Sequence, residues 1–345
     1  MKKTMALVLA CLLALSALTA CGGTNDQQSS QTPPVANNTS AGSSSASNNT
    51  PAGASSVSSP SPSASASPAP NNAPLSPSPA SNAPSSNFNA SRPITVVTRE
   101  EGSGTRDAVR DLFDIKDADG KENVTREAIV ADSTGVMMTN VANDPYAIGY
   151  CSLASLNDTV KALIINGVAA TAENVKSGAY EIQRPFYLAT MGEATGLALD
   201  FIGFILSREG QSAAARRCIP IDDNAPPYSG NAPSGRLVVG GSSSVAPVMA
   251  DLITAYKAVN PNADIELQES DSSKGMNDTK SGAYDIGMAS RAVREAEIAD
   301  GLVPVFIAID GIAVIVNAEN PITAMTTEQV KNIYNGEIEI WSGVN

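Results

Sequence analysis

The chain has 345 residues, with 22 lysine and arginine residues against 35 aspartate and glutamate residues, a formal net charge of −13 and no histidine. This acidity, without a basic stripe, argues against nucleic acid as a partner. The lack of histidine removes the commonest general base and the commonest metal ligand, so histidine-dependent catalysis is excluded and a metal centre is not expected.

The N-terminal segment predicts export and attachment to a membrane. Residues 1–20 begin with a methionine and two lysines, continue into an apolar run and end in small residues. This is the pattern of a secretory signal segment and is too short for a membrane-spanning helix. The sequence Leu18-Thr19-Ala20-Cys21 resembles the bacterial lipobox, which implies that Cys21 is diacylated and anchors the protein at the extracytoplasmic face of the membrane. An ordinary signal peptide followed by a chance cysteine is the alternative.

Residues 21–91 are rich in Ser, Ala, Pro and Asn, almost uncharged, and contain Phe88 as their one aromatic residue. Such a composition cannot bury enough apolar surface to offset the loss of conformational entropy on folding. We expect a disordered tether, which as a flexible chain would reach roughly 45–50 Å root-mean-square.

Segments typical of strands and helices alternate along residues 92–345, which are enough for one large domain or two lobes. The expected strands are 94–98, 129–132, 147–153, 160–165, 184–190, 237–241, 265–269, 285–291 and 303–316. The expected helices are 106–113, 136–141, 196–207, 245–259 and 326–334. This alternation predicts an α/β architecture with mostly parallel sheets, in which ligands bind beyond the carboxyl ends of the strands. The Pro- and Gly-rich segment 222–235 is expected to be a linker.

Hydroxyl-rich turns follow several predicted strands and precede predicted helices, at 103–105, 242–244 and 272–273. The free N–H groups and the dipole of a helix N-terminus attract anions. Small residues let an anion approach the backbone, and Arg99 adds a charged fork. One such turn can be only a helix cap. Three in one chain indicate a single site for a small tetrahedral anion. Segment 129–141 follows the same strand, turn and helix pattern, with its hydroxyls at 133–134.

The sequence does not favour catalysis or a bound cofactor. Without histidine, a serine nucleophile would need a lysine or carboxylate base, and Ser272-Ser273-Lys274 does not have the Ser-x-x-Lys spacing. Residues 117–120 lack the later ligands of a calcium-binding loop. An exported compartment permits a disulfide between Cys151 and Cys218, but two unpaired, half-buried thiols are preferred.

Four motifs resemble the phosphate-binding proteins of phosphate ABC transporters: Arg-Glu-Glu-Gly-Ser-Gly-Thr-Arg at 99–106, Gly-Gly-Ser-Ser-Ser-Val-Ala-Pro at 240–247, Asp-Ile-Gly-Met-Ala-Ser-Arg at 285–291, and Ala-Ile-Asp-Gly-Ile-Ala-Val-Ile-Val-Asn at 308–317. The resemblance implies a type II periplasmic-binding-protein fold whose two lobes close on inorganic phosphate. It further implies a monomeric, non-enzymatic protein that delivers phosphate to a membrane permease or a sensor.

The order of these motifs differs from that of the family, in which the Gly-Ser-Ser-Ser motif comes before the Gly-Ser-Gly-Thr motif. A circular permutation explains the order, with 222–235 as the new linker. A remnant of a duplicated gene is the rival account. The family topology then predicts one lobe at 184–315 and another from 92–183 with 316–345, and it places Arg92 near Asn345.

The resemblance also assigns the ligands of phosphate. Arg99, Ser103, Gly104 and Thr105 would bind it from one lobe, and Ser243, Ser244 and Ser272 from the other, with Ser290 a further candidate. Many family members have an aspartate after the serine of the third motif, where this chain has Arg291, itself a further candidate. An ionised carboxylate accepts the proton of hydrogen phosphate and repels sulfate. Asp310 is the expected replacement, and Asp271 is the alternative.

Two other functions fit the same pattern. The site could bind a different oxyanion, such as sulfate, molybdate or tungstate. The scaffold could also serve as a surface interaction or adhesion protein, a role that a long tether suits.

Overall fold

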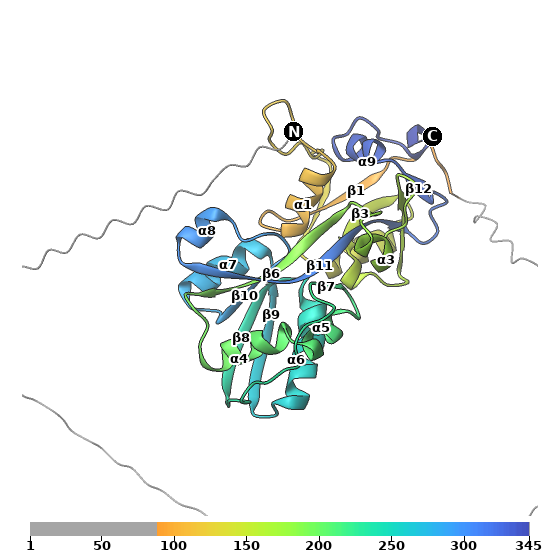
Figure 1. Ribbon diagram of the computed structural model, residues 1–345. Coiled ribbons are helices and arrows are strands. Elements are labelled where there is room, and N and C mark those ends of the chain that lie inside the picture. The colour runs from red at the N-terminus through yellow and green to blue at the C-terminus, as the bar shows by residue number, and fades with distance from the viewer. Residues whose placement is uncertain (1–87, 345) are drawn as a thin grey trace, which may run out of the picture. The chain divides into compact units, whose positions relative to one another are not determined.

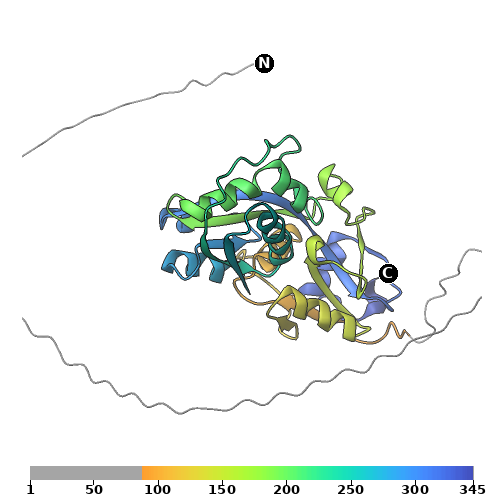
Figure 2. The same cartoon turned by 90° about the horizontal axis from the view of Figure 1, so that it is seen from below.

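The computed structural model describes residues 88–344 of the chain. The predicted signal segment 1–20, the lipidation site Cys21 and most of the predicted tether lie outside the described residues. Figure 1 shows the described part as a mixed assembly of strands and helices, and Figure 2 shows helices on several sides of the strands.

The predicted alternation of strands and helices is confirmed, with shifts of a few residues at element ends. The predicted strand 160–165 is two short strands, and the short helices at 172–176, 208–214 and 295–299 and the short strands at 219–220 and 324–325 were not predicted. The strands are β1 Thr95–Arg99, β2 Ile129–Ala131, β3 Ala147–Ser152, β4 Val160–Ala162, β5 Ile164–Ile165, β6 Gln183–Met191, β7 Ile219–Pro220, β8 Gly235–Ser242, β9 Ala263–Ser270, β10 Ile286–Ala289, β11 Leu302–Asn317 and β12 Ala324–Met325. The α-helices are α1 Gly104–Leu112, α2 Thr134–Asn143, α3 Ala172–Lys176, α4 Gly196–Ile205, α5 Arg208–Ala214, α6 Ala246–Val259, α7 Ser272–Ser281, α8 Glu295–Ala299 and α9 Thr327–Tyr334. Short 3₁₀ turns follow at η1 Leu153–Ser155 and η2 Trp341–Val344.

The main sheet has the strand order β2-β1-β3-β11-β6-β10-β8-β9, with β4 and β7 also paired to β11. Pairing is parallel at both ends of this order, among β1, β2 and β3 and among β8, β9 and β10. It is antiparallel wherever β11 or β6 meets a neighbour. The prediction of mostly parallel sheets was therefore wrong for the centre. The order of strands along the chain does not reveal that β6 and β11 run opposite to the strands beside them.

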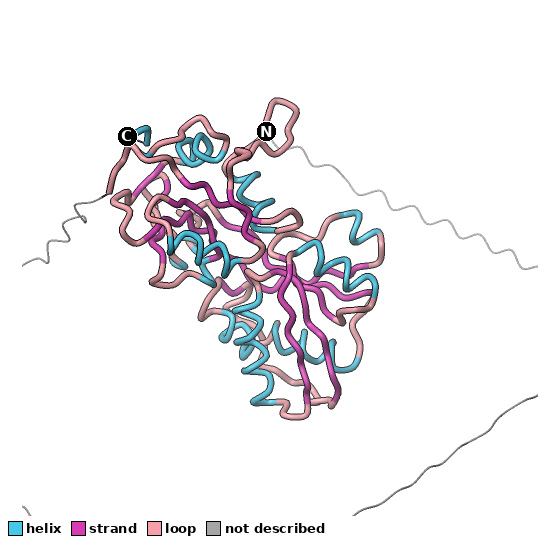
Figure 3. The backbone as a smooth tube through the Cα atoms, turned by 180° about the vertical axis from the view of Figure 1, so that it is seen from behind, coloured by secondary structure: helices cyan, strands magenta, loops and turns pink. Residues whose placement is uncertain are grey.

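Buried apolar side chains form two main clusters. The first core contains residues between 96 and 182 and between 312 and 344, together with Ile219. The second core contains residues between 186 and 308, together with Ala154. Strand β11 belongs to both, because its first part pairs with β6 and its last residues pair with β3 and β4. Figure 1 shows β6 and β11 side by side where the two groups of helices meet, and Figure 3 shows the strands of both parts flanked by helices.

The beginning and the end of the described chain lie together (Figure 1). Pro93 pairs with Ile340 in a β-bridge, and the N–H of Ser342 donates to the carbonyl of Ala90 at 2.7 Å. The predicted tether ended at residue 91, but Phe88 packs its ring 5.0 Å from Tyr146. Residues 88–91 of the predicted tether therefore contact the folded part, and the rest of that segment lies outside the described residues.

Both described cysteines, Cys151 and Cys218, are free and buried. This confirms the prediction of two unpaired thiols, although the prediction of half-buried side chains was wrong. Burial raises the pKa of Cys151 to about 12 and raises that of Cys218 well above its ordinary value. None of the helices within residues 88–344 has the length and apolar character needed to cross a bilayer.

Candidate functional site

The first side of the candidate site is the turn between β1 and α1. The β-branched run of β1 ends at Arg99, and Ser103 caps α1 by accepting a hydrogen bond from the N–H of Arg106. Gly102 has φ +91°, which a residue with a Cβ adopts only at a cost, so glycine is required for the tight turn. The turn brings Ser103, Gly104 and Thr105 into buried positions at the start of a helix.

Arg99 is the charged group of this turn and only 2% of its surface is exposed. Glu100 holds the guanidinium in a two-pronged ion pair, with N···O distances of 2.7 and 2.6 Å. The other edge of the fork donates to the hydroxyl of Thr134 at 3.1 Å and to that of Ser243 at 3.2 Å. The guanidinium is thus fixed by a carboxylate on one side and directed at hydroxyl groups on the other.

The second side comes from the turn after β8, which lies with the second core. Here Ser243 and Ser244 are buried, and their hydroxyls meet those of the first side. The Ser244 hydroxyl lies 2.9 Å from that of Thr105, and the Ser243 hydroxyl lies 3.2 Å from that of Thr134. These contacts join residues more than 100 positions apart, so the predicted convergence of the first two turns is present in the structure.

The third group consists of Ser242, Ser272 and Ser290, all buried. Ser242 donates to the Ser290 hydroxyl at 3.0 Å, and the N–H of Ser290 donates to the Ser272 hydroxyl at 3.1 Å. The turn of Gly104 lies against this group, since a Cβ on Gly104 would come within 2.6 Å of the Ser272 oxygen and 2.8 Å of the Ser290 oxygen. The backbone of the first side therefore approaches the serines of the second side too closely for any side chain.

Asp310, the expected acceptor of a phosphate proton, has a different set of partners. One carboxylate oxygen accepts from the Ser152 hydroxyl at 2.7 Å and from the N–H of Ala154 at 3.4 Å. The other oxygen accepts from Nε and Nη2 of Arg184 at 3.1 and 3.0 Å. An ionised carboxylate has about four lone-pair positions, and these bonds use all of them. In this structure Asp310 therefore fixes Arg184 where β6 and β11 pair, and all acceptor positions of its carboxylate are occupied. Its role as acceptor of a phosphate proton stays a prediction.

The Asp310–Arg184 pair is almost fully buried, with side-chain exposures of 0% and 2%. Burial raises the pKa of the Asp310 carboxyl, whereas the charge of Arg184 and the hydrogen bond from Ser152 oppose the rise. Removal of either partner would leave the other as an uncompensated buried charge.

Arg291, which stands where many relatives of the predicted family have an aspartate, points to another carboxylate. Its guanidinium donates to both oxygens of Glu297, at 2.9 and 2.8 Å. Burial opposes ionisation of Glu297, yet the hydrogen bonds from Arg291 and from the backbone of Arg294 bring its pKa below its ordinary value. Arg294 in turn reaches Asp107 of α1 at 2.8 Å. Arg291 thus belongs to an ion-pair network at the junction of α1 and α8, and its Nη2 also donates to the hydroxyl of Ser273 at 3.4 Å.

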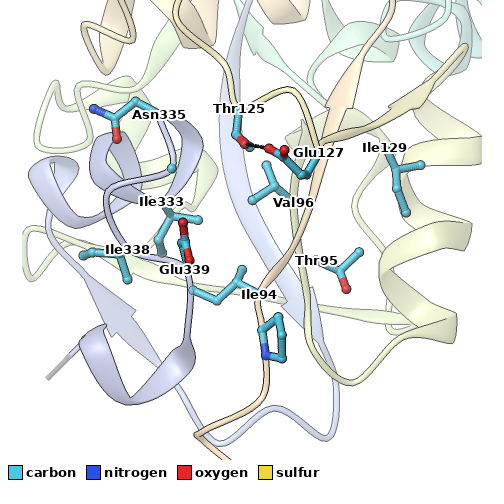
Figure 4. Close-up of a pocket in the computed structure, with 12 residues that line it drawn as sticks. Ile94, Thr95, Val96, Thr125, Glu127, Ile129, Ile333, Asn335, Ile338 and Glu339 are labelled. Atoms are coloured by element: carbon cyan, nitrogen blue, oxygen red, sulfur yellow. Dashed lines mark hydrogen bonds between the residues drawn. The ribbon is translucent and has the colours of Figure 1, made fainter.

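Asp271, the alternative acceptor, caps α7 by accepting from the N–H of Lys274 at 2.8 Å. It also lines a charged groove of about 930 Å³ together with Gly102, Asp107 and Arg294. A separate groove of about 630 Å³ lies between β1 and the segment after α9 (Figure 4). Ile94, Ile129 and Ile338 line it, and Thr125 donates to Glu127 at its rim, so it has no element in common with the hydroxyl groups described above except β1.

Thr134 was not among the predicted site residues, although its turn had the same pattern as the others. It is 3% exposed and contacts Arg99, Ser243 and Ser244. The available signal was the strand, hydroxyl turn and helix at 129–141, and a count of four such turns would have included it. Within residues 88–344, no three Asp, Glu, Cys or His side chains converge to hold a metal ion.

Two α/β cores that share long crossing strands and bring hydroxyl-rich helix starts together define a solute-binding protein suited to a small anion. A family model agrees: the PBP superfamily domain matches residues 79–209 and 226–343. The chain belongs to the PBP superfamily.

Individual relatives extend this assignment. The chain is 44% identical over 271 residues to phosphate-binding protein PstS 2 of Streptococcus agalactiae serotype V, a match that covers 77% of this chain and 92% of that protein. It is 38% identical over 134 residues to phosphate-binding protein PstS of Bacillus subtilis, which covers 38% of this chain and 42% of that protein. Among solved structures, the phosphate-binding protein of a phosphate ABC transporter from Streptococcus pneumoniae TIGR4 superposes with a TM-score of 0.59 at 36% identity, covering 74% of this chain and all of that chain.

Proposed function

We propose that this protein binds inorganic phosphate between its two cores and delivers it to a membrane transporter or a phosphate sensor. The observation that carries the proposal is the convergence of buried hydroxyl groups from both cores on the buried guanidinium of Arg99. Hydroxyls, helix N-termini and a guanidinium are the donors that recognise a tetrahedral oxyanion. The 44% identity to a phosphate-binding protein supports phosphate as that anion.

In this proposal the ligands are Arg99, Ser103, Gly104 and Thr105 from one side and Ser243, Ser244 and Ser272 from the other, with Ser290 beside them. The protein acts by binding and release, without chemical conversion of the phosphate. Relatives that are named as phosphate-binding proteins support a non-enzymatic role.

The two predicted lobes are part of the same proposal. A lobe at 184–315 and another built from 92–183 with 316–345 would open to admit phosphate and close on it. The two separate buried cores support this division, and the pairing of β6 with β11 supports hinge crossings near 183–185 and 314–317.

We further propose that the chain is a circular permutation of the family's usual order. The contact of 90–93 with 340–342 supports it, because termini that lie close together tolerate permutation. The match to the Bacillus subtilis relative spans 38% of this chain, and an exchange of two segments would limit a continuous match to one of them. The Streptococcus agalactiae relative matches along 77% of this chain and 92% of its own length, so in this proposal it shares the permuted order.

The protein would act on the extracytoplasmic side of a bacterial membrane, held there by acyl chains on Cys21 and bound to an ABC-transporter permease as a monomer. The lipobox-like sequence at 18–21 and the extracytoplasmic role of the family support this location.

Isothermal titration of the purified full-length protein tests the ligand. Phosphate should bind to one site per chain, and sulfate should bind more weakly. Binding of sulfate in place of phosphate, or of neither anion, would refute the proposed function.

A further inference from the structure

The turn between β2 and α2 contributes a residue to the site that neither the predicted ligand set nor the relatives' names assign. We propose that Thr134 is a further ligand of the bound anion and that its hydroxyl acts as a hydrogen-bond donor to an unprotonated anion oxygen. The proposal rests on the proposed function, because it concerns the same site.

Hydrogen bonds of both its backbone N–H and its side chain hold Thr134 in place. Ser133 caps α2 by accepting from the N–H of Val136, so the cap itself does not use the Thr134 side chain. The N–H of Thr134 donates to the Ser243 hydroxyl at 3.1 Å. Its own hydroxyl oxygen lies 3.1 Å from Nη1 of Arg99, 3.2 Å from the Ser243 oxygen and 3.1 Å from the Ser244 oxygen. One buried hydroxyl is therefore within hydrogen-bond distance of three residues that are proposed to hold the anion.

The direction of the hydroxyl hydrogens follows from counting donors. A hydroxyl has one hydrogen and two acceptor positions. The Ser243 oxygen faces two groups that can only donate, the guanidinium of Arg99 and the N–H of Thr134. Both of its acceptor positions are filled, so its hydrogen must be directed to the Thr134 oxygen.

The same count then fixes Thr134. Its oxygen accepts from Arg99 and from Ser243, which fills both acceptor positions, so its hydrogen points to Ser244. Ser244 continues the chain to Thr105 at 2.9 Å. In this structure the hydrogens of Ser243 and Thr134 thus point away from Arg99. When the anion takes over the two donors of Arg99, each hydroxyl still has one hydrogen to donate to an unprotonated anion oxygen.

Thr134 also lies at the contact between the two cores, since its partners Ser243 and Ser244 come from the turn after β8 and Arg99 comes from β1. An anion that takes the place of the hydroxyl-to-hydroxyl contacts between the cores would receive the hydrogens that those contacts now use. The Thr134 hydroxyl is therefore a ligand by position, and its backbone N–H keeps the Ser243 hydroxyl in place.

Valine at position 134 tests this directly, because it keeps the β-branched shape and removes only the hydroxyl. In the full-length protein, Thr134→Val should weaken phosphate binding by about 10- to 100-fold, the loss expected for a hydrogen bond to a charged group. Thr134→Ser restores the hydroxyl and should bind within about threefold of the wild type, since the bonds in question involve the oxygen alone. Thr139→Val is the matched control on the same helix, since the Thr139 hydroxyl is exposed and bonds to the carbonyl of Gly135. It should leave affinity unchanged.

The outcomes separate this inference from the function on which it rests. Thr134→Val binding phosphate within threefold of the wild type, or Thr134→Ser binding as weakly as Thr134→Val, would overturn the role of the hydroxyl while leaving phosphate binding intact. A wild type that binds sulfate and not phosphate would overturn the proposed function, and the same series titrated with sulfate would still decide the role of Thr134. A wild type that binds neither anion would overturn both. Should Thr134→Val fail to fold by circular dichroism, Thr134→Ala replaces it with the same expected loss.

Discussion

Arg99 offers the sharpest test of the proposed ligand set. Its side chain is 3% exposed, so its interactions are little screened by solvent. In Arg99→Ala the anion loses a charged donor whose two free-edge contacts now go to Thr134 and Ser243. At about 1.5–3 kcal/mol for each hydrogen bond to a charged group, two lost bonds weaken binding by at least about 3 kcal/mol, or roughly 150-fold.

Glu100 adds a second, separable effect. The carboxylate of Glu100 is paired with Arg99 in the wild type and would be left unpaired near the anion in Arg99→Ala. The double variant Arg99→Ala/Glu100→Ala should therefore bind phosphate more tightly than the single variant, although still more weakly than the wild type.

The measurement is isothermal titration with phosphate, with Arg110→Ala as the control. Arg110 lies on the same helix as Thr105, but it pairs with Asp107 and Asp111 at the surface and should not affect binding. Affinity of Arg99→Ala within threefold of the wild type would show that Arg99 is not a ligand of the anion. A double variant that binds no better than Arg99→Ala would show that the unpaired Glu100 carboxylate does not weaken binding.

Three further outcomes follow from other parts of the structure. Gly104→Ala should weaken phosphate binding and enlarge the radius of gyration measured by X-ray scattering in phosphate, because the new Cβ would lie 2.6 Å from a serine oxygen of the opposite side. Gly135→Ala is the control and should do neither, since the nearest atom to its Cβ would be 4.0 Å away. Equal behaviour of the two variants would contradict the close approach of Gly104 to the opposite side. Asp310→Asn should lower the free energy of unfolding by about 3–5 kcal/mol, because it leaves a buried arginine unpaired, and should keep the phosphate-to-sulfate affinity ratio. Urea denaturation and titration measure these two effects, and a changed ratio in a stable variant would restore Asp310 as the proton acceptor. At pH 8, Cys151 and Cys218 should react with a thiol reagent only after denaturation, because burial raises the pKa of both thiols and little thiolate forms; rapid labelling of the native protein would contradict their burial.

Much of the site could be predicted because its parts are local in sequence. A strand that ends in Gly and hydroxyl residues before a helix is a continuous pattern, and the turns at 103–105 and 242–244 both lie where that pattern places them. The long apolar run at 303–316 likewise corresponds to β11, extended by one residue at each end.

Features that depend on strand register could not be predicted in the same way. Arg184 faces Asp310 because β6 pairs antiparallel with β11 at that register, and no local pattern at either residue records the partner. From the sequence, Asp310 was therefore expected to be an unpaired carboxylate, whereas in the fold it forms an ion pair with the buried Arg184. The antiparallel direction of β6 and β11 was missed for the same reason.

Thr134 shows a different limit. Its turn had the pattern of the other three, but its burial and its position between Arg99 and Ser243 arise only when β2 lies beside β1 in the sheet. Pattern alone indicated a hydroxyl at a helix start. The order of strands in the sheet places that hydroxyl next to the proposed ligands.

One anion should be held by residues from both cores. A crystal structure of the full-length protein with phosphate would show which residues hold it. We expect a phosphate that contacts Arg99 and Thr105 from one core and Ser243 or Ser244 from the other. A phosphate bound by residues of a single core, or bound in the groove between β1 and the segment after α9, would contradict it.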